Sequence, residues 1–484
     1  MNKVESLLKN YGPMISGELA KLYEQKYSAS NDAARQAISR AKSPVQNICF
    51  LSFKNNQKFY YLESQYMSVP FKNAFLEAIE KYSNVNRIYL TAFKMQNGYI
   101  SKNILPAFTA SPVERVKGHK MHSRVIEDLL KTQLIVEEDE FYALNPQFFS
   151  RSNFAHSRAL EIVKKTIVND FYRWARGVNL ISYHKGKGLT DNAVFAHFQW
   201  AFTAPSYISP MFSPKAGKPG FVVADVMFEK TATVDNISFF IEKLKIVRSF
   251  KKIPPFLPVL LVDKISPEAL EQLKSQNVMV AILNNLYSEK YTALLNELVN
   301  VFTNLTAFIN HNPQKIEALF NEVAKNEGRY NNLAGDMFEL LVGRHYQFIG
   351  SKNIIANQKA IDSGTGKYKE VDLIVERDGK IIAVECKGTR SKIGEDFVQK
   401  WLNENIPVIR NWLLENYGAP SLEFQLWSAG GFTENALELL EKAQMNTKKY
   451  SVKYYGPQQM LAKAKAHSDN SFTELFNRHY NYFI

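Results

Sequence analysis

The spacing of apolar positions near the N-terminus predicts two helices separated by a short break. Apolar residues recur at helical spacing after Ser16, and the break at residues 27–29 is followed by Ser30, a residue type that caps helices well. The second helix has an apolar face that includes Ala34 and Ile38. Its opposite face is polar and basic, and comprises Arg35, Gln36, Ser39, Arg40 and Lys42.

Two β-rich runs follow these helices, at residues 48–51 and 59–62, and the polar residues between them suit a hairpin. Helix, turn, helix and hairpin is the element order of a winged helix-turn-helix, so we expect such a module over residues 1–65. The second helix of this motif enters the major groove of DNA, which makes its basic face a candidate nucleic-acid-binding surface. Modules of this kind also serve protein contacts alone, and that alternative stays open.

Residues 66–147 have a similar order and are expected to form a second winged-helix-like module. Helical patterns at 71–82 and 122–131 precede two β-rich runs at 134–136 and 141–144. The tip between these runs carries four consecutive acidic residues, 137–140. Because phosphate repels carboxylates, we expect this tip to stay away from nucleic acid.

Helical and strand patterns alternate through residues 148–300, which predicts a middle α/β domain. The expected elements are a helix at 154–174, a strand at 221–228, a helix at 237–250, a strand at 258–262, a helix at 267–275 and a strand at 278–283. The whole chain is therefore predicted to be an α/β multidomain protein.

A hairpin in the last third of the chain brings charged residues together. Asp378-Gly379 between two β-rich runs is a strong two-residue turn signal. With that turn, Asp372 faces Glu385 across the hairpin, and Glu385 shares a strand face with Lys387. Cys386 points to the other face and is expected to be a small core residue.

Both strands of this hairpin are otherwise apolar, so the two facing carboxylates lose hydration and repel each other. A divalent cation relieves the conflict, and oxygen ligands suit Mg²⁺ or Mn²⁺. Lys387 beside such an ion can orient a water or stabilise charge on a phosphate. The alternative is a Glu–Lys pair on an exposed face opposite an exposed Asp.

The spacing of Asp372 and Glu385-Cys386-Lys387 resembles the signature of the PD-(D/E)xK, or restriction-endonuclease-like, nuclease superfamily. The resemblance covers roughly residues 330–460 and implies an α/β/α nuclease domain, which we place at 301–484. It implies that Asp372 and Glu385 bind the metal, that Lys387 assists the water, and that Glu339 on the preceding helix contacts a second metal or a water. Gln399, on an expected helix at 396–403, matches an auxiliary polar position. The proline of the family name is absent here, where the chain reads Glu370-Val371-Asp372.

The element order of the middle domain resembles the same fold more faintly. Glu161 lies on its helix and Asp225 on the matching strand, but no lysine stands two residues after Asp225. A nuclease-like middle domain at 148–300 is therefore expected to be inactive.

Composition narrows the functional classes. The 484 residues carry a formal charge of +13, and the basic excess is five in residues 1–150, seven in 151–300 and one in 301–484. Such a distribution favours a polyanionic partner bound by the first two thirds of the chain, although solubility alone is the alternative. Two cysteines, no apolar run long enough for a membrane span and no signal peptide predict a cytoplasmic protein without a membrane partner.

These features lead to one functional hypothesis with two alternatives. We expect a Mg²⁺- or Mn²⁺-dependent endonuclease that hydrolyses phosphodiester bonds of DNA, double-stranded rather than single-stranded. The resemblance implies restriction or antiviral defence against foreign DNA, with repair and transposition open, and with a homodimer or a partner ATPase. The alternatives are a non-catalytic DNA-binding regulatory or scaffold protein with a vestigial nuclease fold, and an RNase.

Overall fold

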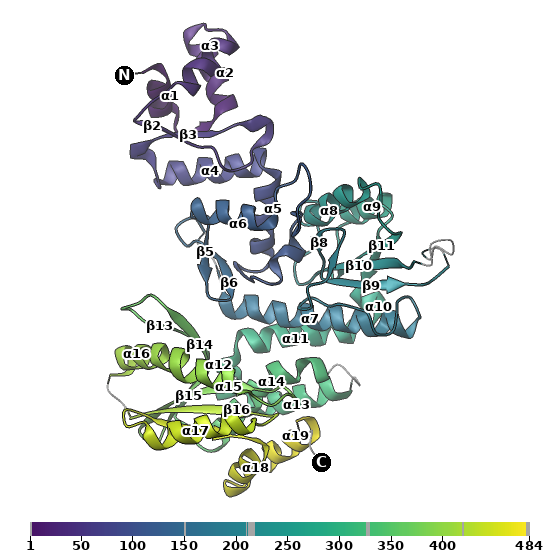
Figure 1. Cartoon of the computed structure of the whole chain (residues 1–484), viewed down its shortest axis with the longest axis vertical. Coiled ribbons are helices and arrows are strands. Elements are labelled where there is room, and N and C mark those ends of the chain that lie inside the picture. Colours follow the sequence, from purple (N-terminus) through teal and green to yellow (C-terminus); the bar gives the residue numbers. More distant parts are fainter. Residues whose placement is uncertain are drawn as a thin grey trace. The chain divides into compact units, whose positions relative to one another are not determined.

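The computed structural model describes residues 2–149, 152–209, 211, 218–325, 330–418 and 421–480. The chain forms two compact units. The first consists of residues 1–157 and 172–286, and the second of residues 158–171 and 287–484. The long helix α7 (Phe154–Gly177) contributes residues to both units. Each unit is a mixture of helices and β-sheets (Figure 1).

The first unit begins with three helices and a three-stranded antiparallel sheet of order β1-β3-β2. Ser30 caps the third helix as predicted, because its hydroxyl accepts a hydrogen bond from the Ala33 N–H. The elements are α1 (Lys3–Tyr11), β1 (Met14–Ile15), α2 (Ser16–Tyr27), α3 (Asn31–Ser39), β2 (Val45–Ile48), a 3-10 turn (Lys54–Asn56), β3 (Phe59–Leu62) and a second 3-10 turn (Glu63–Gln65).

The prediction of a first hairpin strand at residues 48–51 was wrong. The pairing with β3 runs from Val45 to Ile48, whose side chains supply the buried positions of β2. Residues after Ile48 leave the ladder, and Leu51 is buried from an irregular segment instead. The apolar character of this run therefore reflects packing of a loop rather than strand pairing.

The next part of the first unit forms a second three-stranded antiparallel sheet, of order β4-β6-β5, with three helices. The predicted helices at 71–82 and 122–131 are present, whereas α5 and β4 were not predicted. The elements are α4 (Val69–Tyr82), α5 (Asn84–Met95), β4 (Tyr99–Ser101), a 3-10 turn (Leu105–Phe108), α6 (His122–Lys131), β5 (Ile135–Glu138) and β6 (Phe141–Leu144).

The last part of the first unit is a four-stranded sheet of order β12-β11-β10-β9. Strands β10, β11 and β12 are parallel, and β9 is antiparallel to β10. The core on one side of this sheet includes Phe240 and Leu244 of the helix after β10. The elements are β7 (Val194–Phe195), β8 (Phe198–Gln199), β9 (Phe202–Ser206), β10 (Gly220–Met227), α8 (Ser238–Arg248), β11 (Phe256–Val262), α9 (Pro267–Ser275), β12 (Met279–Ile282) and α10 (Leu283–Leu286).

The second unit is built on a five-stranded sheet of order β13-β14-β15-β16-β17 with helices packed on it. Its elements are α11 (Glu289–Thr303), α12 (Leu305–His311), α13 (Pro313–Lys325), α14 (Tyr330–Phe348), β13 (Asn353–Ile361), β14 (Tyr368–Arg377), β15 (Lys380–Lys387), α15 (Glu395–Lys400), a π-helical turn (Trp401–Asn405), α16 (Ile406–Tyr417), β16 (Ser421–Ser428), α17 (Glu434–Asn446), β17 (Ser451–Tyr455), α18 (Pro457–Ala466) and α19 (Asn470–His479).

Strand directions in this sheet place an antiparallel meander, β13 to β15, beside two parallel strands, β16 and β17. Helices α15, α16 and α17 share an apolar core with one face of the sheet. The same order, an antiparallel pair followed by two parallel strands with intervening helices, occurs in the sheet of β9 to β12. The two largest sheets of the chain thus share a topological pattern. In the described part of the chain, no helix has the length and apolar character to cross a membrane.

Candidate active site

The hairpin of β14 and β15 forms with the predicted turn and register. Asp378 and Gly379 have φ values of 50° and 71°, and such left-handed conformations at both central residues make a tight hairpin turn. Arg377 pairs with Lys380, and the ladder continues to Leu373 opposite Val384. One further step in this register places Asp372 opposite Glu385.

Asp372 is held at the end of this ladder by the backbone of the neighbouring strand. Its Oδ2 accepts a hydrogen bond from the Cys386 N–H at 2.7 Å, and the side chain is only 6% exposed. Cys386 itself is buried, as predicted for a core residue. A charged carboxylate at this depth requires compensation from hydrogen bonds or from positive charge.

Glu385 and Lys387 share one face of β15 and contact each other. The Lys387 Nζ donates to the Glu385 Oε1 at 2.6 Å. The same Nζ lies 5.2 Å from the ring centre of Phe397 on α15, close enough for a cation–π interaction. The alternative of an exposed Glu–Lys pair does not fit this environment, because the Glu385 side chain is only 12% exposed.

Helix α14 adds a third carboxylate to this group. Glu339 is buried, and its pKa is raised well above its usual value, first by burial and then by the nearby charge of Asp372. Glu339 also contributes to the raised pKa of Lys387. The helix before the sheet therefore brings Glu339 close to the carboxylates of the hairpin.

Two residues that the sequence analysis did not select complete the group. Arg158, on the part of α7 that belongs to the second unit, forms an ion pair with Glu370 and places its Nη2 3.5 Å from the Glu339 Oε1. Glu370 shares the alternation of β14 with Asp372, which is the signal that could have identified it. Arg158 gave no such signal, because it precedes Glu370 by 212 residues. We call Glu339, Glu370, Asp372 and Glu385 the acidic cluster.

Burial and the charges of neighbouring groups shift the pKa values of Glu370, Glu385 and Lys387. Burial raises the pKa of Glu385 to about 7, with Lys387 opposing the shift and Asp372 adding to it. Burial also raises the pKa of Glu370, against the attraction of Arg158. Burial alone lowers the pKa of an amine, but Glu385 and Asp372 outweigh this effect and raise the pKa of Lys387. Lys387 is therefore an ammonium ion at neutral pH.

The oxygen atoms of the acidic cluster are potential ligands for a divalent cation. In each of three carboxylates, one oxygen contacts a protein group: Asp372 Oδ2, Glu385 Oε1 and Glu339 Oε1. No group of three or more His, Cys, Asp or Glu side chains among the described residues is arranged to hold a metal ion. A site with one or two carboxylates and several waters is the usual arrangement for Mg²⁺. The donor set of Asp372 and Glu385 fits that simpler arrangement.

An unusual backbone conformation lies beside Asp372. Asn357 of β13 occupies the register position opposite Asp372, between the pairs Ala356–Leu373 and Gln358–Val371, and has a φ of 53°. Its buried side-chain oxygen has no hydrogen-bond partner among the described residues. An acceptor without a donor is the kind of group that ordered water or a cation satisfies.

Gln399 does not join the acidic cluster. It lies on α15, as predicted, but its side chain is exposed and its amide donates to the Glu395 Oε1 at 2.8 Å. An amide held on the surface of its own helix has no position from which to act on the carboxylates of β14 and β15. The structure therefore gives Gln399 a helix-surface role.

The candidate nucleic-acid-binding residues of the N-terminal module share one exposed face. Arg35, Gln36, Ser39 and Arg40 of α3 are exposed, and so is Lys42 just beyond it. The opposite side of α3 is fixed in the core through Ala34 and Ile38. In the second sheet, the acidic tip between β5 and β6 is partly neutralised, since Glu137 forms an ion pair with Lys102 at 2.5 Å.

The middle sheet holds a different carboxylate arrangement. Asp225 of β10 forms an ion pair with Lys243 of α8 at 2.7 Å, and both side chains are fully buried. Asp225 also accepts from the Ala201 N–H, and the Lys243 Nζ also donates to the carbonyl oxygens of Ala107 and Gln199. Every donor of this ammonium group thus has a partner, so the pair is closed to a metal ion or a substrate.

Comparisons with models of protein families, with curated proteins and with solved structures found no match for this chain.

Proposed function

We propose that the chain is a divalent-cation-dependent nuclease that cleaves DNA, with a PD-(D/E)xK type of active site in the second unit. The observation that carries this proposal is a charge imbalance. The acidic cluster holds four carboxylates, of which Glu339 and Asp372 are buried and the other two half-buried. Its contacting cations among the described residues are Lys387 and Arg158. Two negative charges stay uncompensated when all four carboxylates are ionised, and one divalent cation would neutralise them.

Asp372 and Glu385 are the residues that would hold the cation, with Glu339 in support. Oxygen ligands favour Mg²⁺ or Mn²⁺ at this site. When bound, such an ion would supply Lewis-acid polarisation of the phosphate and would lower the pKa of the attacking water.

Lys387 has a defined chemical role in this proposal. Its raised pKa keeps it protonated, so it donates hydrogen bonds and does not act as a base. The reaction forms a bond from a water oxygen to phosphorus and breaks the bond to the leaving oxygen on the opposite side. Negative charge grows on the phosphate oxygens during this exchange, and an ammonium group in a partly buried site stabilises that charge.

The first unit is proposed to deliver DNA. Residues 301–484 have a basic excess of only one, so they contribute little to attraction of a polyanion. The exposed basic face of α3 suits contact with the major groove, if residues 1–65 act as a winged helix-turn-helix. The closed Asp225–Lys243 pair supports a middle domain that is nuclease-like but inactive. Restriction or defence against foreign DNA is the role that the family resemblance favours.

The test is a cleavage assay of the full chain with plasmid DNA, linear duplex DNA, single-stranded DNA and RNA. Each substrate is incubated with Mg²⁺, with Mn²⁺ and with EDTA. We expect metal-dependent cleavage of duplex DNA that is lost in Asp372→Asn and in Lys387→Met. Matched controls are Asp396→Asn and Lys400→Ala, which change exposed residues of α15 and are expected to retain activity. Cleavage that persists in both site variants would show that the proposed site is not responsible.

One observation favours a second candidate, a non-catalytic DNA-binding protein. Arg158 already supplies positive charge to Glu339 and Glu370, as a structural counterion does in a vestigial site. Binding of duplex DNA without cleavage under any metal condition would support this candidate. Cleavage confined to the RNA arm would instead identify an RNase, and cleavage that requires an added ATPase would reveal a partner.

A further inference from the structure

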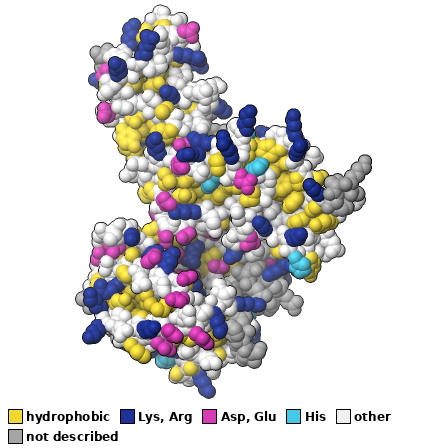
Figure 2. Space-filling view, in the orientation of Figure 1, with side chains coloured by type: hydrophobic (Ala, Val, Ile, Leu, Met, Phe, Trp, Pro, Cys, Tyr) yellow, Lys and Arg dark blue, Asp and Glu magenta, His cyan; other side chains and the backbone are white. Residues whose placement is uncertain are grey.

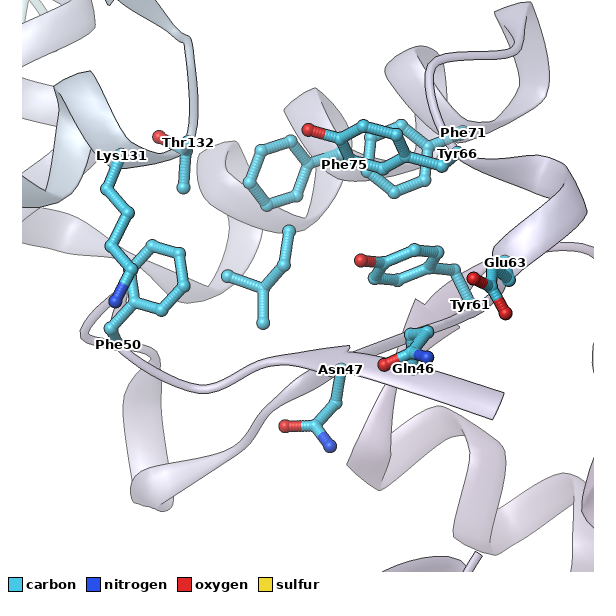
Figure 3. Close-up of a pocket in the computed structure, with 11 residues that line it drawn as sticks. Gln46, Asn47, Phe50, Tyr61, Glu63, Tyr66, Phe71, Phe75, Lys131 and Thr132 are labelled. Atoms are coloured by element: carbon cyan, nitrogen blue, oxygen red, sulfur yellow. The ribbon is translucent and has the colours of Figure 1, made fainter. Parts of the chain in front are cut away.

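A cavity of about 300 Å³ lies in the first unit between the β2–β3 hairpin, α4 and α6. Its walls combine aromatic and polar side chains. Figure 3 shows the rings of Tyr66, Phe71 and Phe75 on one side and Tyr61 on the strand side. The volume is at the small end of the range for ligand pockets, about 300–1,000 Å³, which suits one planar ring system rather than a large ligand.

The aromatic rings are packed against each other but keep an open face. The ring centres of Tyr61 and Tyr66 are 5.8 Å apart with an interplanar angle of 31°. Tyr66 also contacts Phe71 edge-on, at 5.3 Å. Nevertheless, Tyr66 is 47% exposed, so part of its ring is available to stack with a ligand.

Polar groups with unused hydrogen-bonding capacity lie beside these rings. Gln46 and Asn47 of β2 and Glu63 line the cavity (Figure 3). Among the described residues, the side-chain amides of Gln46 and Asn47 and the carboxylate of Glu63 have no hydrogen-bond partner. Amide and carboxylate groups are the side chains that read donor and acceptor edges of nucleobases.

The charge of the surrounding module, rather than of the cavity lining, favours an anionic chain that carries an uncharged ring. The lining has one acid, Glu63, and one base, Lys131. Figure 2 shows Lys and Arg side chains on the surface of the N-terminal module. Residues 1–65 contain nine Lys or Arg and five Asp or Glu. Lys131 lines the far end of the cavity, where its Nζ lies 4.4 Å from the ring centre of Phe50. This ammonium group already occupies one aromatic face and would repel a second cation, which disfavours a methylammonium ligand.

We infer that this cavity binds one unstacked nucleobase of a nucleic acid, with aromatic rings on its face and amide groups on its edge. A base outside the stack is bound by proteins through stacking on aromatic side chains and hydrogen bonds to its edge. The inference deepens the proposed function, because it rests on a nucleic acid as the partner. It would let the first unit recognise a base that is single-stranded, mismatched or turned out of a duplex.

The experiment measures binding of the full chain in EDTA, where no metal-dependent cleavage takes place. The probes are two labelled oligonucleotides of equal length and charge, one with normal bases and one made of abasic sites. Fluorescence anisotropy gives the affinity for each. The variants are Tyr66→Ala and the double variant Gln46→Ala with Asn47→Ala. Tyr11→Ala is the matched control, because Tyr11 is a similarly exposed tyrosine of the same unit.

We expect Tyr66→Ala to weaken binding of the base-containing probe by on the order of tenfold, the effect of losing one base–aromatic stack. Binding of the abasic probe should not change, since its phosphates do not use the ring. The Gln46/Asn47 double variant should likewise weaken binding of the base-containing probe alone, since its amides are proposed to contact the edge of the base. Thermal melting of each variant shows whether a loss of binding arises from misfolding.

Equal effects of Tyr66→Ala on both probes, or no effect on either, would overturn the inference. Saturable binding of tetramethylammonium that Tyr66→Ala abolishes, without discrimination between the probes, would assign the cavity to a cation and also overturn it. Because the binding assay contains no metal, its result can be interpreted even where the cleavage assay contradicts the proposed nuclease activity.

Discussion

Replacing Arg158 by alanine tests whether positive charge is what holds the acidic cluster together. The guanidinium pairs with Glu370 and approaches Glu339, and its own side chain is 25% exposed. In the variant, Glu339 stays buried and Glu370 stays half-buried, but both lose that compensating charge. Their ionised forms then become less favourable than in the native protein.

The size of the effect follows from the degree of burial. Loss of one partner from a fully buried ion pair costs about 3–5 kcal/mol, and loss of an exposed pair costs about 0–1 kcal/mol. Arg158 lies between these limits, so we expect a loss of roughly 2 kcal/mol at pH 8. For a unit of this size, that corresponds to a decrease in Tm of about 4–8 °C.

The effect should depend on pH in a defined direction. The pKa values of Glu339 and Glu370 are raised in the folded protein. Below the unfolded pKa of a carboxyl group, both states are protonated and a missing counterion has little consequence. The cost of Arg158→Ala should therefore be small near pH 4.5 and should grow as the pH rises to 8.

Thermal unfolding at pH 4.5 and pH 8, with EDTA and with Mg²⁺, measures this cost. Mg²⁺ should restore part of the lost stability at pH 8, because a bound cation replaces the missing positive charge. Arg478→Ala is the matched control, since its ion pair with Glu474 is exposed and should contribute little at either pH. An equal loss at both pH values would refute the electrostatic explanation and would indicate lost packing instead.

Three further predictions address other groups. The pKa of Glu385 is about 7 in the folded protein and 4.5 ordinarily, so the free energy of unfolding without metal should decline by roughly 3 kcal/mol as the pH rises between those values. Urea titrations should show that Glu385→Gln flattens this decline. Asp225→Asn leaves Lys243 buried without its counter-charge, so it should destabilise the first unit by about 3–5 kcal/mol in calorimetry while folded protein retains cleavage activity. Arg35→Ala combined with Arg40→Ala should weaken DNA binding and reduce the salt slope of log K by about 2 in anisotropy titrations.

Each of these has a result that would contradict it. If the stability of Glu385→Gln falls with pH as steeply as that of the native protein, another group is responsible for the decline. Loss of cleavage in well-folded Asp225→Asn would give the middle sheet a role in the reaction. An unchanged salt slope in the arginine double variant, with Lys21→Ala as a control on α2, would remove α3 as a phosphate-binding surface.

The parts of the fold that were predictable are those determined by short stretches of sequence. The β14–β15 hairpin followed from Asp378-Gly379 and from the alternation of its strands, and the observed register agrees. Helix α3 followed from its Ser30 cap. By contrast, β2 was misplaced, because the apolar run after Ile48 packs as a loop and does not pair. Apolar character alone does not distinguish these two uses.

The residues that were missed are those whose role depends on distant partners. Arg158 enters the acidic cluster from a helix 212 residues before Glu370, and no local pattern indicates that contact. Lys243 is similar. The absence of a lysine two residues after Asp225 was visible in the sequence, but the ion-pair partner of Asp225, Lys243, comes from α8. Tertiary packing decides both pairings.

The two sheets that share a topological pattern differ in how they compensate buried carboxylates. In the middle sheet, one acid meets one amine whose donors are all used, so the site is neutral and closed. In the sheet of the second unit, four acids meet two cations, and burial with mutual repulsion raises the pKa values of Glu339, Glu370 and Glu385. Such a site is stabilised by proton uptake or by a divalent cation, so metal binding and proton release should be coupled there. A buried carboxylate thus serves structure where its charge is balanced and can serve chemistry where it is not.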